Sequence, residues 1–119
     1  MGKIVRGFVY AYQGIRYAFR TQINFKIHIL TIIAAVILGI VFKLKASEWL
    51  WITAAAALVI ISELFNTAIE TLVDLVSPEY NKKAGIVKDL SAAAVLLSAF
   101  FAVIVALLIF VPKLWQYAS

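Results

Sequence analysis

Four polar side chains recur along one stretch of an otherwise apolar sequence. Glu63, Asn66, Glu70 and Asp74 are three or four residues apart, which places all of them within an arc of about 80° on a helix. A carboxylate in the middle of a bilayer costs about 2.5 to 3.5 kcal/mol, so such residues usually face a protein interior or a wet cavity. The spacing predicts a functional polar face, with a purely structural network that fixes helix packing as the alternative.

Depth along this helix separates the acids. Counted inward from Trp49, Glu63 is about 21 Å and Glu70 about 32 Å along the axis, whereas the hydrocarbon layer is about 30 Å thick. Glu63 is therefore predicted to meet a polar group of a lipid, and Glu70 to meet a ligand that arrives from the cytosol. Asp74 is predicted to lie among the headgroups.

A cation and a further acid, Lys88 and Asp89, directly precede the last apolar stretch. Mg²⁺ is usually held by one or two carboxylates together with substrate phosphates, and Lys binds phosphate as a point charge. With Glu70 this pair predicts a site for a metal–nucleotide complex, although a Lys beside an Asp at a membrane edge would alone be unremarkable. The sequence has no GxxxxGK[ST] or GxGxxG loop, so side chains and metal would have to bind the nucleotide.

His28 is the only histidine of the chain. It follows Arg20 by eight residues and Asn24 by four, so the three are predicted to share one helix face. Either a proton carrier or an interfacial hydrogen-bond partner would fit this position.

Apolar helices must position these residues. Hydrophobic residues make up 65% of the 119 residues, against about 45 to 50% in soluble proteins. The sequence has no Cys, which excludes disulfides, thiolate metal sites and cysteine nucleophiles. We expect a single all-α integral membrane domain over residues 1–119.

Hydrophobic periodicity and the positions of charged residues divide this domain into four segments. An amphipathic helix suited to the membrane surface is predicted over about 3–23. Transmembrane spans are predicted over about 25–42, 48–76 and 90–111, with a loop at 77–88 and the last span closed by Pro112.

The basic residues predict the orientation of the chain. Of the 11 Lys and Arg residues, five lie before or at the start of the first span and three lie in 77–88. Only two lie between the first two spans and one near the C-terminus. The positive-inside rule then puts the N-terminus and the 77–88 segment in the cytoplasm. Because these charges flank the spans, the net charge of +5 does not indicate nucleic-acid binding.

Three segments together resemble the bacterial diacylglycerol kinase and undecaprenol kinase family. They are GIRYAFRTQINFKIH (14–28), ELFNTAIETLVDLVSPEY (63–80) and KDLSAAAVL (88–96). The resemblance implies a homotrimer in the inner membrane that phosphorylates a lipid hydroxyl with Mg-ATP, with active sites shared between neighbouring subunits.

The resemblance also implies roles for individual residues. Glu63 would be the catalytic base that acts on the lipid hydroxyl, Asn66 a positioning residue and Glu70 a metal ligand. Lys88 and Asp89 would hold the ATP phosphates and adjacent groups. Further positions that match the family are Tyr10, Asp74, Glu79, Tyr80 and Asn81 at the nucleotide site, and Lys3 near the lipid substrate.

Gln22 departs from the family pattern, because many relatives have a metal-binding Glu at this position. An amide oxygen can still coordinate Mg²⁺ but contributes no charge. Either metal binding is then weaker, only one ion is held firmly, or another acid compensates. We expect Gln22 to remain at the nucleotide and metal site with a raised Mg²⁺ requirement.

Two other classes of function also fit parts of the sequence. A proton- or ion-conducting protein could use Glu63, Glu70 and His28 as a relay, but this leaves Lys88 and Asp89 unexplained. A structural membrane subunit would leave the acidic face without a purpose. Within the kinase family, the run from Asn24 to His28 leans towards the undecaprenol kinases, but the sequence does not choose between diacylglycerol and undecaprenol.

Overall fold

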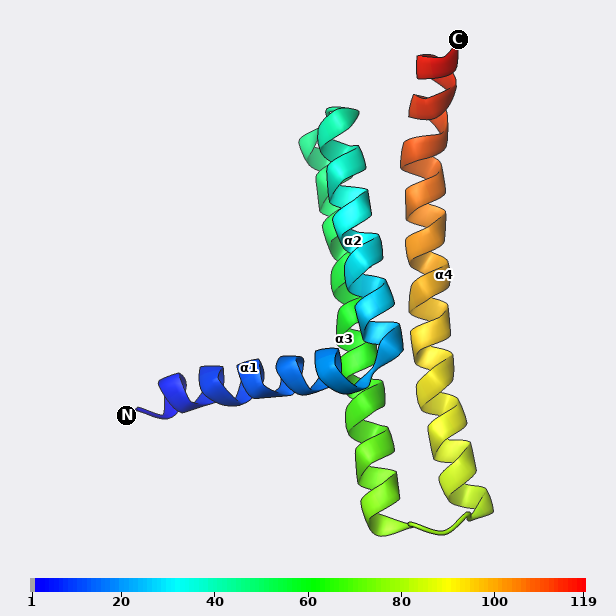
Figure 1. Ribbon diagram of the computed structural model, residues 1–119. Helices are drawn as coiled ribbons and strands as arrows, with labels where there is room; N and C mark the ends of the chain where they lie inside the picture. Colours follow the sequence, from blue (N-terminus) through cyan, green and yellow to red (C-terminus); the bar gives the residue numbers. More distant parts are fainter. Residues whose placement is uncertain (1) are drawn as a thin grey trace.

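The computed structural model describes residues 2–119, which form four helices. They are α1 (Lys3–Thr21), α2 (Ile23–Val41), α3 (Ala46–Val76) and α4 (Lys82–Ala118). Helices α2, α3 and α4 run side by side, and α1 runs across them (Figure 1). The α3–α4 connection lies at the opposite end from the C-terminus, beyond the level of α1.

Helices α2, α3 and α4 are each long and apolar enough to cross a membrane. The observed bounds of α2 and α3 lie close to the first two predicted spans. An all-helical protein with three spanning helices is therefore confirmed.

The first helix ends two residues before the predicted limit of about 23. Helix α1 ends at Thr21, and Gln22 has an extended backbone with φ −112° and ψ 111° before α2 begins. Arg20 is consequently on a different helix from Asn24 and His28, so the predicted common face of these three residues does not exist. The break at Gln22 is what allows α1 to run across the other helices (Figure 1).

The predicted 77–88 loop was also too long. Only 77–81 is non-helical, because the Asn81 side-chain oxygen accepts hydrogen bonds from the backbone N–H of Lys83 (2.9 Å) and Ala84 (3.4 Å) and so caps α4. At its other end α4 continues through Pro112 to Ala118. Spanning helices tolerate Pro when neighbouring groups satisfy the freed carbonyl.

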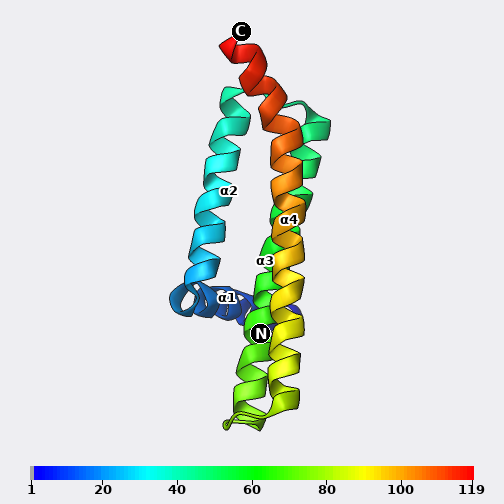
Figure 2. The same cartoon turned by 90° about the vertical axis from the view of Figure 1, so that its right-hand side faces the viewer.

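The α3–α4 pair forms the main packed unit. A quarter turn of the molecule shows α3 and α4 against each other while α2 stands apart from α4 (Figure 2). Ser62 and Ser98 share a hydrogen bond of 2.7 Å between the middles of the two helices, and Lys113 pairs with Glu48 at 3.1 Å near the C-terminal end of α4. Polar contacts thus hold the pair in register over most of its length.

Gly39 allows α2 to approach the start of α3. A Cβ atom at this position would lie 2.5 Å from a ring carbon of Trp49 and 3.0 Å from a methyl carbon of Leu44. Real Cβ contacts are longer than this, so only glycine fits the observed packing.

Candidate active site

The predicted polar face of α3 exists, and its exposure changes along the helix. Glu63 and Asn66 are buried, Glu70 is half-buried, and the Asp74 side chain is 66% exposed. Exposure of these polar side chains therefore increases from Glu63 towards Asp74.

A chain of hydrogen bonds links α4 to two of these residues. The Ser91 hydroxyl donates to Oδ1 of Asn66 (2.8 Å), and Nδ2 of Asn66 donates to Oε1 of Glu70 (2.6 Å). Both ends of the Asn66 amide are thereby engaged, which fixes the carboxylate of Glu70. Sequence reasoning missed Ser91, although it is three residues after Lys88 and so on the same side of α4.

Glu63 is the most deeply enclosed acid. Its side chain is 1% exposed, and its Oε2 atom is buried without a hydrogen-bond partner. Nε2 of His28 on α2 lies 3.6 Å from this oxygen, within ion-pair range but too far for a hydrogen bond. The Glu63 carbonyl accepts a hydrogen bond from the Thr67 hydroxyl, which is local to α3.

Lys88 on α4 pairs with Asp74 on α3, near the ends of the two helices that the 77–81 connection joins. The distance from Nζ to Oδ1 is 2.6 Å. Lys88 precedes the apolar stretch of α4 and so lies outside the membrane-spanning part. The hydrogen bond to Asp74 raises the pKa of Lys88 above its ordinary value.

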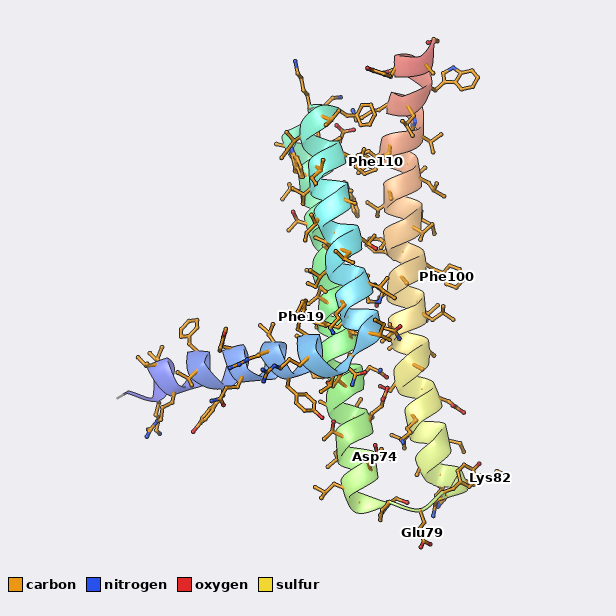
Figure 3. The ribbon with its side chains drawn as sticks, in the orientation of Figure 1. Phe19, Asp74, Glu79, Lys82, Phe100 and Phe110 are labelled. Carbon is orange, nitrogen blue, oxygen red and sulfur yellow. The ribbon has the colours of Figure 1, made fainter. Side chains whose placement is uncertain are left out.

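A polar pocket surrounds this pair. Its volume is about 350 Å³, and Figure 3 shows Asp74, Glu79 and Lys82 at this end of the molecule. Six of the predicted site residues line it, namely Asp74, Glu79, Tyr80, Asn81, Lys88 and Asp89. The short 77–81 connection is therefore what brings them together.

Three predicted site residues lie elsewhere. Lys3 starts α1, at the end that points away from α3 (Figure 1), and Tyr10 is 66% exposed on the same helix. Gln22 is half-buried at the α1–α2 junction, where its Nε2 donates to the Thr21 hydroxyl at 3.4 Å. None of these three lines the pocket around Lys88.

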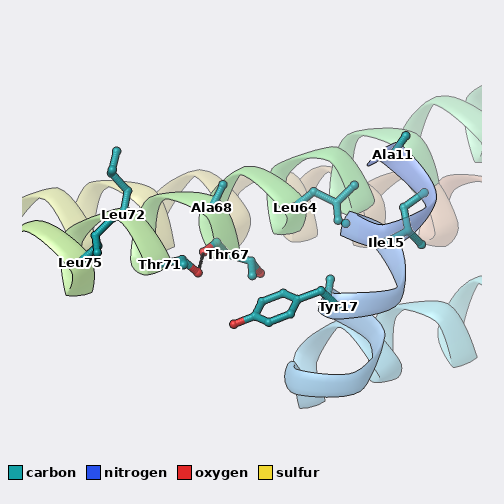
Figure 4. A pocket seen from close by; sticks show the side chains of 11 residues that line it. Ala11, Ile15, Tyr17, Leu64, Thr67, Ala68, Thr71, Leu72 and Leu75 are labelled. Atoms are coloured by element: carbon teal, nitrogen blue, oxygen red, sulfur yellow. Dashed lines mark hydrogen bonds between the residues drawn. The ribbon is translucent and has the colours of Figure 1, made fainter. Parts of the chain in front are cut away.

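An apolar groove separates α1 from α3. It has a volume of about 640 Å³, and Figure 4 shows side chains from both helices directed into it. Leu64 and Thr67, which follow Glu63 and Asn66 in the sequence, form part of its wall. A hydrocarbon surface thus adjoins the turn of α3 that bears the acids.

Within residues 2–119, no three His, Asp or Glu side chains cluster closely enough to form a metal cage. Glu70 is instead a single fixed carboxylate near the polar pocket. Mg²⁺ commonly binds in this manner, with one or two carboxylates and the remaining ligands from phosphates and water. The residues present fit a metal that arrives with a nucleotide.

Known proteins resemble the chain over nearly its whole length. The family model described as prokaryotic diacylglycerol kinase matches residues 9–110. A diacylglycerol kinase of Synechocystis sp. is 44% identical over 108 residues, which are 90% of this chain but only 62% of that protein. An undecaprenol kinase of Bacillus subtilis is 37% identical over 114 residues, 96% of this chain and 93% of the relative.

A diacylglycerol kinase of Escherichia coli is 30% identical over 115 residues, 97% of this chain and 91% of that enzyme. These three relatives are named as kinases, which favours phosphoryl transfer over an ion-conducting relay. The resemblance noted in the sequence is confirmed by the match over 9–110 and by the coverage of these relatives. The chain belongs to the prokaryotic diacylglycerol kinase family.

Proposed function

We propose that this protein is a membrane lipid kinase that transfers the γ-phosphate of ATP to the hydroxyl of a membrane lipid. The observation that carries the proposal is the arrangement on α3, where an enclosed carboxylate, Glu63, lies two turns from Glu70, which is held by Asn66. Family membership supports the same activity.

Glu63 is proposed to act as the base. It accepts the proton of the lipid hydroxyl while the hydroxyl oxygen bonds to the γ-phosphorus and the bond from that phosphorus to ADP breaks. Asn66 holds Glu70 in place through the hydrogen bond of 2.6 Å. Phosphoryl transfer depends mainly on positioning and charge neutralisation. Glu63 at the lipid hydroxyl and Glu70 at the nucleotide would supply these two requirements.

The pocket around Lys88 is proposed to receive the nucleotide. Lys88 would leave Asp74 and pair with a phosphate, while Asp89, Glu79, Tyr80 and Asn81 line the remainder. Tyr10 is proposed as a further nucleotide contact and Lys3 as a contact of the lipid, both on the basis of family resemblance.

Mg²⁺ is the proposed cofactor, with Glu70 and Gln22 as its protein ligands. When bound with ATP it would neutralise charge on the phosphates. Glu70 supports this assignment because it is the acid that Asn66 and Ser91 hold fixed.

We also propose a placement in the bacterial inner membrane. Helix α1 would lie on the cytoplasmic surface, since it runs across the spanning helices (Figure 1) and exposes Ile4, Phe8 and Phe19. A homotrimer with shared active sites is proposed from the family; it would bring Tyr10 or Lys3 of one subunit to the pocket of another.

Either diacylglycerol or undecaprenol would serve as the lipid. Both present a primary hydroxyl at headgroup depth, and relatives named for each are similar to this chain. Side-by-side assays of the purified protein on the two lipids decide between them.

Transfer of labelled phosphate from ATP into lipid tests the proposal. The purified protein in lipid vesicles should label an added lipid alcohol. Glu63→Gln should insert and fold but lose about 10²- to 10⁴-fold in kcat, since it removes the base without a change of shape. Absence of transfer by the wild type on either lipid would overturn the kinase function, and retention of most activity by Glu63→Gln would exclude Glu63 as the base.

A further inference from the structure

His28 and Glu63 come from different helices and meet inside the protein. Nε2 of His28 on α2 lies 3.6 Å from Oε2 of Glu63 on α3. The His28 side chain is 22% exposed and that of Glu63 is 1% exposed. The proposed role of Glu63 as a base leaves His28 without a function.

The enclosed oxygen of Glu63 needs a partner. Oε2 is buried and accepts no hydrogen bond in this structure. A buried carboxylate without a partner is unfavourable, and nearby Glu70 adds like charge. Because Oε2 is enclosed, a lipid hydroxyl would have to reach the other oxygen of Glu63.

The surroundings single out His28 as that partner. The α4 side chains buried along this face, Ser91 and Ser98, are neutral and already donate to Asn66 and to the Ala94 carbonyl. His28 also borders a cavity of about 280 Å³ between α2, α3 and α4, which gives its ring room to move. A shift of less than 1 Å would shorten the 3.6 Å separation to about 2.8 Å, a charge-assisted hydrogen bond.

We propose that His28 is a positioning residue for Glu63, whose cationic imidazole pairs with Oε2 and leaves the second carboxylate oxygen, as an anion, to face the lipid hydroxyl. This inference rests on the proposed kinase function. His28 touches neither ATP nor lipid and acts only through the carboxylate. The charge of the imidazole offsets that of Glu63 in a buried site.

Steady-state kinetics of substituted proteins test this role. His28→Gln keeps a hydrogen-bond donor but no charge, and we expect kcat to fall about 10- to 100-fold while KM for ATP changes less than about twofold. His28→Lys restores a cation and should recover most of the lost kcat. Thr31→Val is the matched control, because Thr31 lies one turn along α2 beside the same cavity and bonds only to the Ile27 carbonyl in this structure.

A double-mutant cycle separates an effect through Glu63 from a general structural one. Glu63→Asp withdraws the carboxylate from His28 while keeping an acid. In this background His28→Gln should lower kcat less than about threefold, since the contact is already lost. An equal loss in both backgrounds, an unchanged kcat in His28→Gln alone, or no recovery in His28→Lys would overturn the proposal.

A spectroscopic measurement is independent of kinase activity. His28 is the only histidine, so ¹⁵N labelling of histidine reports on one ring. Glu63→Gln should shift the Nε2 resonance, and Thr31→Val should leave it unchanged. An unshifted Nε2 resonance in Glu63→Gln would overturn the pairing. If Glu63→Gln shifts the resonance but the wild-type protein transfers no phosphate, only the kinase function is overturned.

Discussion

Ser91 is an uncharged residue whose contribution is visible only in three dimensions. Its hydroxyl satisfies the buried Oδ1 of Asn66, which in turn orients Glu70. Ser91→Ala would leave that oxygen without a donor, at a cost of about 1 to 3 kcal/mol, and free Asn66 to turn. We expect the Mg²⁺ concentration for half-maximal activity to rise about tenfold, as measured by activity against Mg²⁺.

Ser98→Ala is the control for this prediction. Ser98 lies two turns further along α4 and bonds to Ser62 and to the Ala94 carbonyl, remote from Glu70 in the chain of hydrogen bonds. Its Mg²⁺ dependence should match that of the wild type. Unchanged Mg²⁺ dependence in Ser91→Ala would show that Asn66 orients Glu70 without help.

Gln22 is the position where a neutral side chain replaces the usual acid of the family. Gln22→Glu adds a negative charge at the proposed metal site, so the Mg²⁺ concentration for half-maximal activity should fall. Gln13→Glu, which adds the same charge to exposed α1, should have no such effect. If Gln22→Glu leaves the Mg²⁺ titration unchanged, Gln22 is not a ligand.

At the scale of single residues, polarity made part of the candidate site predictable. Glu63, Asn66 and Glu70 stood out because polar residues are costly in an apolar run, and the structure puts them on one face. Ser91 was not predicted, because a hydroxyl group is tolerated in any spanning helix and carries no such cost. The His28–Glu63 contact depends on how α2 lies against α3, which no spacing within one helix could reveal.

Close packing of α2 on the start of α3 depends on one small residue. Gly39→Ala would drive Trp49 from its place, and such overpacking costs about 1 to 3 kcal/mol. We expect a lower unfolding temperature in detergent. Gly7→Ala, whose new methyl group meets nothing within 4 Å beyond its chain neighbours and the backbone of its own helix, should be as stable as the wild type or more so, because Ala favours helix.

Equal stability of the two alanine variants would mean that Trp49 moves aside without loss. The comparison is matched because both glycines are in helices and both gain the same helix propensity. Any difference between them then reports on the contact with α3.

Element boundaries were harder to predict than the elements themselves. Apolar length identified the three spanning helices, since it reflects the thickness of the bilayer. The beginning of α4 was missed because Gly85 and several Lys residues resemble a loop, whereas the Asn81 cap starts a helix there. The break at Gln22 was missed because the residues around it continue a helical pattern.

The orientation of the whole molecule can be measured with single cysteines, because the chain has none. Lys82→Cys marks the start of α4 next to the 77–81 connection, and Ser47→Cys marks the exposed start of α3. If the basic residues face the cytoplasm, a membrane-impermeant maleimide should label only Ser47→Cys in intact spheroplasts. Lys82→Cys should react after the membrane is disrupted, and its labelling in intact spheroplasts would reverse the proposed topology.

Helices α3 and α4 are joined by one ion pair near each end, and the two ion pairs differ in their surroundings. Lys88 and Asp74 lie in the polar pocket, whereas Lys113 and Glu48 join the helices far from it. An anion that draws Lys88 from Asp74 unlocks only one end of the pair. The Ser91–Asn66 and Ser62–Ser98 hydrogen bonds still join the helices between the two ion pairs. Any spreading of α3 from α4 during turnover would then pivot about these hydrogen bonds, with its largest amplitude at the 77–81 connection.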